Sequence, residues 1–500
     1  MKNLHKILYL VPLAFAFSCE PEFDDLPAPT GGSADFTNYV AVGNSLTAGF
    51  QSSALRRVRQ ENSFPAILAT QFKEIGGGEF KQPLLDPGVG IGSTLNAESE
   101  LSYQTDCRGE TSLAPVPSAS QGQIDQFNFP ASMIGANGPF NNVAVPGAKS
   151  YHLVAQGYGD PSGVQAGTAN PFYARFVNIQ NTQEPVINQA VAANPTFFSL
   201  WIGNNDVLGY ALNGGEGQDH NETNNTNPAT YGNADITNNN TFANIYSQLV
   251  GALTSNGIKG VVANIPDITS IPHFTTIPTS TTPLRQGQAD TLNFIYASYN
   301  ADLDSAVANG QINQPQANKR KISFSAGVNP WVIIDTDLNG FVRQTATGGT
   351  WPAMRQMRSG ELLTLTTPQN SLKCEGMGTA TPMGPNPIPA QYVLTRNEIK
   401  SINDAVASYN ATIKQLADAN GLAFVDANAI LKEMESGLSF NGVTYSTEFV
   451  SGGAFSLDGV HPNTVGYAII ANAHIDAINS KYGSSIPKVD VNQYEGIVFP

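Results

Sequence analysis

Three side chains with complementary chemistry stand near opposite ends of this 500-residue chain. Ser45 follows an apolar run and has small neighbours, so the turn presents its hydroxyl group. Asp458 and His461 lie three residues apart, just before the last helical pattern. A serine hydroxyl is a weak nucleophile alone, an imidazole titrates near neutrality, and a carboxylate can orient that imidazole. These residues therefore predict acyl transfer, with Ser45 as nucleophile, His461 as base and Asp458 as the orienting acid.

Two further stretches carry donors for a developing oxyanion. Gly147 lies in Pro-Gly-Ala at 146–148, and Asn205 lies in Gly-Asn-Asn-Asp at 203–206. Backbone N–H groups and side-chain amides are the donors that such a site requires, so Ser45 N–H, Gly147 N–H and the Asn205 amide are the candidates for an oxyanion hole. Each stretch alone is also typical of an ordinary turn, and the second could be an Asx-capped turn. The prediction depends on their occurring together.

The elements that must position these residues are short strands that alternate with helices. Apolar runs of strand character occupy residues 39–42, 142–145, 197–202, 260–265 and 423–426. Helical patterns occupy residues 241–255, 286–308 and 399–421, and a threonine and a glutamate spaced as a capping box precede the last of these. Strands that are almost continuously apolar indicate a parallel sheet covered on both faces. Because ligands bind at the carboxyl ends of such strands, the candidate loops should meet at one edge.

In order and spacing, the four stretches resemble the motifs of the SGNH/GDSL hydrolase family, which contains esterases and lipases. The Gly-Asp-Ser-Leu motif corresponds to residues 43–46, where Asn44 replaces the usual aspartate. The family's second glycine, Gly-x-Asn-Asp and Asp-x-x-His motifs correspond to Gly147, 203–206 and 458–461. The resemblance spans residue 39 to about residue 480, with the insertions unmatched. Asn44 is not a triad member and keeps an acceptor oxygen, so we expect activity to survive its presence.

The resemblance implies a fold class and a function. The fold is α/β: a flavodoxin-like three-layer sandwich with a five-stranded parallel sheet and long loop insertions. The function is that of a serine esterase or lipase that hydrolyses carboxylic esters and needs neither cofactor nor metal. Alternatives are a non-catalytic glycan- or lipid-binding protein on the same scaffold, and an O-acyltransferase. Apolar patches in the insertions favour a lipid ester, whereas an Asn-rich rim favours an acylated glycan, and a small acyl ester suits both.

The expected domain organisation is one α/β domain with long excursions between its core elements. The segments are a signal peptide at 1–18, an acidic Pro/Gly-rich tether at 19–36, the hydrolase domain at 37–485 and a tail at 486–500. Insertions are expected at about 51–141, 207–240 and 270–394. The Asn/Gly/Thr tract at 213–240 should be exposed and mobile. A separately folding module within 270–394 is the alternative for the last insertion.

The N-terminus predicts export. Lys2 and Lys6 precede an apolar stretch at 7–17 that is too short to span a bilayer. Small residues before Cys19 resemble a bacterial lipoprotein cleavage site, which implies lipidation of Cys19 and an outer-membrane protein facing the periplasm or the cell surface. The alternative is a plain secretory signal with an incidental cysteine. We expect a monomer that meets the membrane through its anchor.

The net charge of the chain limits the classes of molecule that it can bind. The net charge is −15, and without Lys2 and Lys6 the chain has 23 basic and 40 acidic residues, or −17. Such a surface repels nucleic acid, so nucleic-acid binding is excluded.

Apart from Cys19, the cysteines are Cys107 and Cys374, which could form a disulfide in an oxidising compartment or remain as two free thiols.

Other candidate sites are weaker. Residues 335–340 imitate the start of an EF-hand loop, but Ala346 stands where a bidentate glutamate is required. Asn339-Gly340 is better interpreted as a hairpin turn between strands at 332–334 and 341–342. Asn463 should cap the last helix. The remaining residues considered are Trp201, expected in the core or the pocket wall, His474, expected packed or on the surface, and His152, His220 and His273, which lack metal-ligand spacing.

Overall fold

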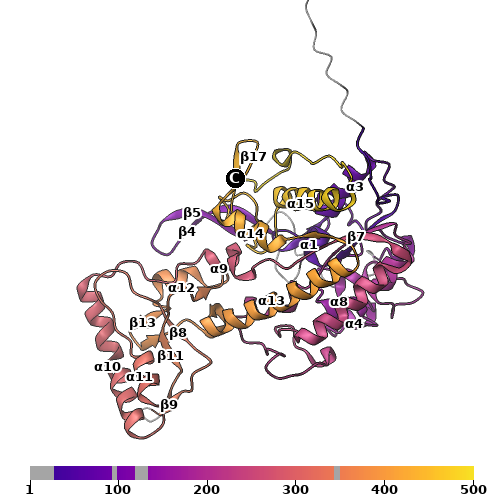
Figure 1. Cartoon of the computed structure of the whole chain (residues 1–500). Coiled ribbons are helices and arrows are strands. Elements are labelled where there is room, and N and C mark those ends of the chain that lie inside the picture. The colour runs from indigo at the N-terminus through magenta and orange to yellow at the C-terminus, as the bar shows by residue number, and fades with distance from the viewer. Residues whose placement is uncertain (1–27, 93–97, 119–132, 343–348) are drawn as a thin grey trace, which may run out of the picture.

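A four-stranded parallel sheet lies at the centre of the computed structural model, which describes residues 28–92, 98–118, 133–342 and 349–500 (Figure 1). The strands in spatial order are β1 (Tyr39–Gly43), β6 (Phe197–Trp201), β7 (Lys259–Ala263) and β16 (Ala423–Val425). Every residue of β1 and β6 is buried, because helices cover both faces of the sheet. The predicted α/β class and four of the five predicted strands are confirmed.

The fifth predicted strand, residues 142–145, is not a regular strand. It makes one parallel bridge to Ala41 at the free edge of β1. The N–H groups of Val143 and Val145 donate to the carbonyls of Ala41 and Gly43, each at 3.0 Å. Pairing is therefore present but short, and the proline that follows cannot donate another hydrogen bond.

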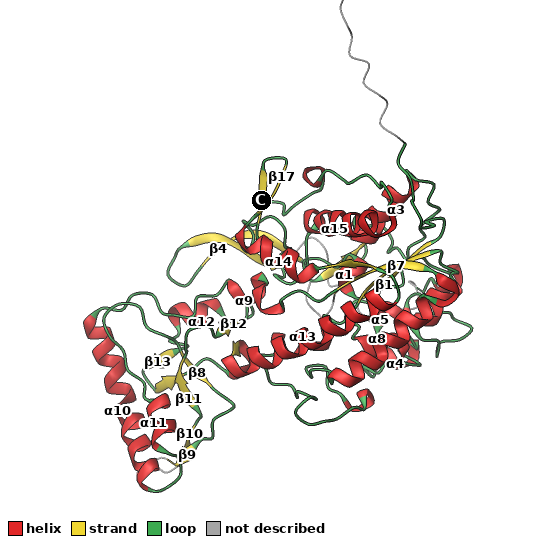
Figure 2. Ribbon diagram, in the orientation of Figure 1, coloured by secondary structure: helices red, strands yellow, loops and turns green. Residues whose placement is uncertain are grey.

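Helices form one layer on each side of the sheet (Figure 2). On one face, α3 (Phe64–Lys73) packs against α15 (Thr464–Tyr482). The helices of the other face are α6 (Val186–Ala192), α7 (Asn205–Leu212), α8 (Asn239–Leu253) and α13 (Arg396–Ala419). Helix α3 lies inside the predicted insertion at 51–141, yet its buried Phe64 and Phe72 belong to the main core. That stretch therefore includes a core helix.

The helix ends follow the capping residues read from the sequence. Thr395 and Glu398 form a capping box at the start of α13, as predicted. Asn463 caps α15 by accepting from Gly466 N–H at 3.0 Å, which confirms its predicted role. Its amide also donates to the carbonyls of Gly453 and Phe455, so the same side chain ties the preceding loop to the helix.

Residues 270–394 form a lobe at the lower left of Figure 1, where α10 and α11 flank short strands. Two clusters of buried apolar residues lie in this lobe, apart from the main core. Its helices are α9 (Pro272–Thr275), α10 (Gln286–Ala308), α11 (Gln314–Arg320) and α12 (Gln369–Cys374). Its paired strands are β8 (Val332–Ile334) with β11 (Met354–Gln356), β9 (Phe341–Val342) with β10 (Thr350–Trp351), β12 (Leu362–Leu363) with β15 (Val393–Leu394), and β13 (Thr379–Thr381) with β14 (Gly384–Asn386).

The predicted hairpin between residues 332–334 and 341–342 is wrong. Strand β8 pairs with β11 and strand β9 pairs with β10, so the two do not pair with each other. A buried ion pair between Asp335 and Arg355 of β11 fastens the end of β8 to β11. Asp335 is also the first residue of the stretch at 335–340 that imitates an EF-hand loop, and this ion pair engages its carboxylate.

The tract at 213–240 is not exposed throughout, contrary to the prediction. Residues 235–238 and His220 are buried. His220 Nε2 bonds Asp235 Oδ2 at 2.8 Å, and the ring of Tyr231 stacks on the imidazole with centroids 3.9 Å apart. Local hydrogen bonds of this kind let a polar tract pack, and composition does not reveal them.

A disulfide between Cys107 and Cys374 joins two insertions that are 267 residues apart. Cys107 lies at the tip of a hairpin made of β4 (Ser99–Thr105) and β5 (Thr111–Pro117). An ion pair of Lys373 with Asp106, at 3.0 Å, accompanies the covalent bond. The hairpin is therefore fastened to α12 of the lobe.

Within the described ranges, no helix is long and apolar enough to cross a membrane.

The buried ion pairs of the lobe generate a stability prediction. Arg355 also binds Glu361 through two hydrogen bonds at 2.7 and 2.8 Å, and the side chains of both residues are almost inaccessible. Glu361→Ala should lower the free energy of unfolding by about 3 kcal/mol, because it leaves part of a buried charge unpaired. Lys400→Ala, which removes an exposed pair with Asp404, should change it by less than about 0.5 kcal/mol. Urea unfolding followed by tryptophan fluorescence measures both, and equal midpoints would contradict this account.

Candidate active site

An unbroken line of hydrogen bonds joins Ser45, His461 and Asp458. Ser45 is the first residue of α1 (Ser45–Ala48), immediately beyond the carboxyl end of β1. Its Oγ lies 2.9 Å from His461 Nε2, and His461 Nδ1 lies 2.9 Å from Asp458 Oδ2. The structure thus brings together residues 416 positions apart in the sequence, in the arrangement of a nucleophile, its base and the acid that orients the base.

The Asp458 carboxylate organises the loop around it. Its Oδ1 accepts from the N–H groups of Val460 and His461, each at 2.9 Å, and from Ser456 Oγ at 3.0 Å. Its Oδ2 accepts from Ser53 N–H at 3.0 Å in addition to the imidazole. Burial alone would raise the pKa of this carboxyl, but the adjacent imidazole and these donors together hold it well below its usual range. Asp458 therefore stays ionised.

Two serines near the base of the β4–β5 hairpin support the acid from one side. Ser52 and Ser53 both have positive φ, 49° and 68°, which is uncommon for residues other than glycine. This backbone aims Ser53 N–H at Asp458 and lets Ser52 N–H donate to Ser456 Oγ at 2.9 Å. Sequence analysis missed these residues, because nothing in a Ser-Ser pair signals left-handed backbone.

The lobe supports the same loop from the other side. His273 N–H donates to Gly459 O at 2.9 Å, and Gly459 has a positive φ (69°), which glycine adopts without strain. A Cβ at Gly459 would lie 3.1 Å from His273 N, so the two backbones need this close approach. Burial lowers the pKa of His273 to about 4, so the ring is neutral near pH 7. His273 supports this loop and does not belong to the line of hydrogen bonds from Ser45 to Asp458.

The predicted oxyanion donors lie on neighbouring loops that are bonded to one another. Ser45 opens α1, where the first N–H groups have no acceptor within the helix. Asn205 opens α7, and its amide donates to Ala148 O at 2.9 Å with one of its two hydrogens. Gly147 has φ of 80°, which explains the need for glycine beside Ala148. These contacts hold the second and third motifs together.

Asn44 uses both ends of its amide. Its Oδ1 accepts from Leu46 N–H at 3.1 Å and caps α1, as the usual aspartate could also do. Its Nδ2 donates to Asn204 Oδ1 at 3.3 Å, which an ionised aspartate could not do. Asn44 therefore links residues 43–46 to residues 203–206 and takes no part in the hydrogen bonds that join Ser45, His461 and Asp458.

Asp206 fastens the two oxyanion loops further. It is fully buried, and its two oxygens accept from the N–H and the hydroxyl of Ser150 at 2.7 and 2.6 Å. Burial raises the pKa of Asp206, although these hydrogen bonds and the nearby Lys149 oppose that rise. Lys149 in turn donates to Asp235 O at 2.8 Å, which ties the tract at 213–240 to the site. The spacing of motifs in the sequence did not predict this contact between Lys149 and Asp235.

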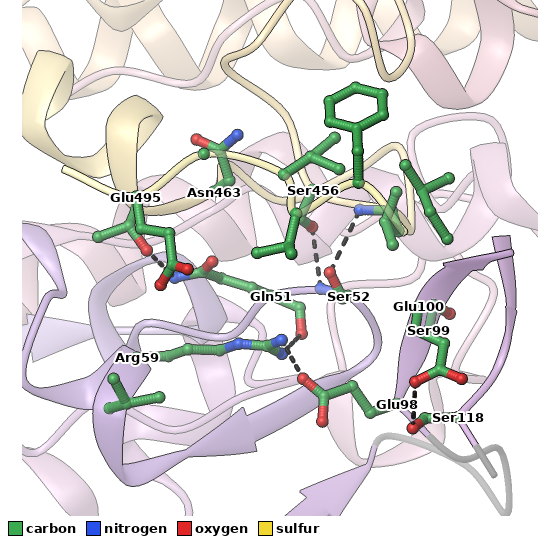
Figure 3. Close-up of a pocket in the computed structure, with 18 of the residues that line it drawn as sticks. Gln51, Ser52, Arg59, Glu98, Ser99, Glu100, Ser118, Ser456, Asn463 and Glu495 are labelled. Carbon is green, nitrogen blue, oxygen red and sulfur yellow. Dashed lines mark hydrogen bonds and ion pairs between the residues drawn. The ribbon is translucent and has the colours of Figure 1, made fainter. Parts of the chain in front are cut away.

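A cavity of about 810 Å³ with both polar and apolar lining residues lies beside the Asp458 loop, between the hairpin base and the C-terminal segment (Figure 3). Ser52 and Ser456 form part of its wall, and Arg59, which binds Glu98, forms another part. The tail predicted at 486–500 supplies Glu495. Ser456 and Leu457 of the loop before Asp458 line the cavity, whereas Ser45 and His461 do not.

Other predicted residues have structural roles. Trp201 and His474 are buried in or beside the main core, as predicted, and the His474 ring stacks on Phe64 with centroids 4.6 Å apart. The described part of the chain has no group of three or more His, Cys, Asp or Glu side chains that could hold a metal ion. Cys19 lies outside the described residues.

Comparison with known proteins gave no match. No family model, no curated protein and no solved structure matches this chain.

The lowered pKa of Asp458 generates a pH prediction. Because its folded pKa lies below the unfolded value of about 4, its ionised form stabilises the fold above that pH and stops doing so as pH falls. The stability advantage of the wild type over Asp458→Asn should therefore be full at pH 6 and shrink towards pH 2.5. Urea unfolding at both pH values measures it. A difference independent of pH would contradict the assignment.

Proposed function

We propose that this chain is a serine esterase of the SGNH/GDSL type that hydrolyses carboxylic esters. The observation that carries the proposal is the line from Ser45 Oγ through His461 to the ionised Asp458, with 2.9 Å at each step. Four sequence motifs in the family's order support it. We further propose that the core is flavodoxin-like, with residues 142–145 as an irregular fifth strand at the edge of β1.

The mechanism follows from these contacts. Ser45 Oγ attacks the ester carbonyl carbon while His461 Nε2 accepts its proton, and Asp458 stabilises the imidazolium that forms. Ser45 N–H, Gly147 N–H and the second hydrogen of the Asn205 amide stabilise the oxyanion. The imidazolium then protonates the leaving alkoxide, and an acyl-enzyme remains on Ser45. Water, deprotonated by His461, releases the acid and restores the serine.

Ser45 lies in a partly enclosed site. The residue is 7% exposed, and the Phe50 ring packs against His461 with centroids 4.9 Å apart. A low-dielectric surrounding of this kind strengthens the interactions of the oxyanion with its donors. We also propose that Cys19 carries a lipid anchor, so that the enzyme works at the outer membrane on small, lipid or acylated-glycan esters.

Hydrolysis of p-nitrophenyl acetate by protein lacking residues 1–19 tests the function. Ser45→Ala should abolish turnover, and Asn205→Ala should lower kcat by roughly 10²–10³, because it removes one oxyanion donor. Asn213→Ala, an exposed asparagine just beyond the end of the same helix, is the matched control and should leave kcat unchanged. Absorbance of released p-nitrophenol gives the rates.

Two outcomes would contradict the proposal. Turnover that persists in Ser45→Ala would place the nucleophile elsewhere. No turnover by folded wild-type protein would instead favour a binding role on the esterase scaffold. If an added acceptor alcohol is acylated in preference to water, the enzyme is a transferase that shares the first half-reaction.

A further inference from the structure

Hydrogen bonds hold the backbone on both sides of Gly147. In residues 145–150, four N–H groups have acceptors within the protein, at 2.7 to 3.1 Å. They are the N–H groups of Val145, Ala148, Lys149 and Ser150, which donate to Gly43 O, Val145 O, His152 Nδ1 and Asp206 Oδ2. Pro146 has no N–H group, and the described residues offer no acceptor to Gly147 N–H. Because Gly147 is exposed, this N–H group is free to bind a substrate oxygen.

Two of the contacts in this segment connect Gly147 with the proposed nucleophile. Val145 N–H donates at 3.0 Å to the carbonyl of Gly43, which lies two residues before Ser45. The Asn205 amide donates at 2.9 Å to the carbonyl of the residue after Gly147. Gly147 therefore lies on a short segment that is bonded to the strand end of Ser45 on one side and to Asn205 on the other.

The carbonyl of the same peptide group is already bonded. Asn170 Nδ2 donates to Pro146 O at 2.9 Å. Pro146 O and Gly147 N–H belong to one planar trans peptide, so they point in opposite directions, and a bond that fixes the carbonyl also fixes the direction of the N–H group. The same bond polarises the peptide and makes its N–H group a stronger donor, because linked hydrogen bonds reinforce one another.

The Asn170 amide is itself held in place. Its Oδ1 accepts from Phe172 N–H at 2.8 Å and from Tyr173 N–H at 3.2 Å, and so caps α5 (Pro171–Ala174). Its second amide hydrogen goes to Tyr158 Oη at 3.0 Å. All four hydrogen bonds that an asparagine side chain can make are therefore formed, and the amide cannot turn without losing some of them.

We propose that Asn170 is a positioning residue of the oxyanion hole, which orients and polarises the peptide group whose N–H, that of Gly147, stabilises the oxyanion. The inference rests on the proposed esterase function and deepens it. Asn170 acts through the Pro146–Gly147 peptide and does not touch the substrate. A residue that only capped α5 would use its oxygen alone, whereas Asn170 also uses its nitrogen.

Two variants separate the donor from the cap. Asn170→Ser keeps an oxygen that can cap α5, but its side chain is too short to reach Pro146 O as well. Asn170→Asp also keeps a capping oxygen, and it places a second acceptor in front of the Pro146 carbonyl where the donor was. The serine variant removes the donor without adding a charge.

Asn227 provides the matched control. It also precedes a proline, and it caps a short 3-10 helix (Pro228–Thr230) by accepting from Ala229 N–H at 3.2 Å. Asn227 is exposed, and among the described residues its side chain makes no contact with residues 145–150. Asn227→Ser therefore makes the same chemical change at the same kind of cap, away from Gly147.

The experiment measures kcat and KM for p-nitrophenyl acetate, and the inhibition constant of trifluoromethyl hexyl ketone. Ser45 Oγ adds to the carbonyl carbon of this ketone while His461 takes the proton, and the resulting hemiketal has its oxyanion in the same hole as the transition state. The ketone therefore reports on the oxyanion donors separately from turnover.

Asn170→Ser should lower kcat by about 10- to 100-fold with KM nearly unchanged, which is less than the roughly 10²–10³-fold loss on removing a donor, because Gly147 N–H is still present but is less well aligned. The inhibition constant should rise by the same factor as kcat falls. Asn170→Asp should lower kcat further, since the Pro146 carbonyl then faces an acceptor. Asn227→Ser should leave kcat, KM and the inhibition constant at their wild-type values.

The outcomes distinguish this inference from the function on which it rests. Turnover that depends on Ser45 but is unchanged in both Asn170 variants would overturn the positioning role and preserve the esterase. A lower kcat with an unchanged inhibition constant would also overturn it, because that result indicates fewer folded active sites and not a weaker oxyanion hole. No turnover by folded wild-type protein would overturn the proposed function, and the inference with it.

Discussion

The proposed site depends most on the hydrogen bonds that the Asp458 carboxylate accepts. One oxygen closes the loop by accepting from the N–H groups of Val460 and His461, and the other holds the imidazole and accepts from Ser53. Hydrogen bonds to a charged group each contribute about 1.5–3 kcal/mol, so one side chain fixes both the loop and the ring orientation. Its low pKa is the electrostatic consequence of the same contacts.

The insertions at about 51–141 and 270–394 both support the loop that carries this carboxylate. The hairpin side reaches it through Ser53, and the lobe reaches its loop through the hydrogen bond from His273 to Gly459. The disulfide of Cys107 with Cys374 joins the far ends of the same two insertions. The acid loop is thus held between two supports that are themselves covalently linked, which restricts the ways in which the imidazole can move away from Ser45.

The sequence was sufficient for the α/β class, four strands and the caps, because each depends on local pattern, and the order of the four motifs predicted that Ser45, Asp458 and His461 meet. Contacts outside these patterns and motifs escaped it. Ser52 and Ser53 bond residues 404 and 405 positions away, whereas the pairing of β8 with β11 and the packing of the tract around His220 use side-chain partners 20 and 15 positions away. None of these contacts has a signature in the local sequence. Composition suggested an exposed tract, but buried hydrogen bonds determined the result.

The most direct test of the central claim is covalent labelling of Ser45. A fluorophosphonate reacts only with a serine hydroxyl that a base activates, so intact-protein mass spectrometry should show one adduct, and peptide mapping should place it on Ser45. His461→Ala should lose the adduct under the same conditions. Absence of labelling in folded wild-type protein, or labelling that persists in His461→Ala, would contradict the assignment of Ser45 and His461 as nucleophile and base.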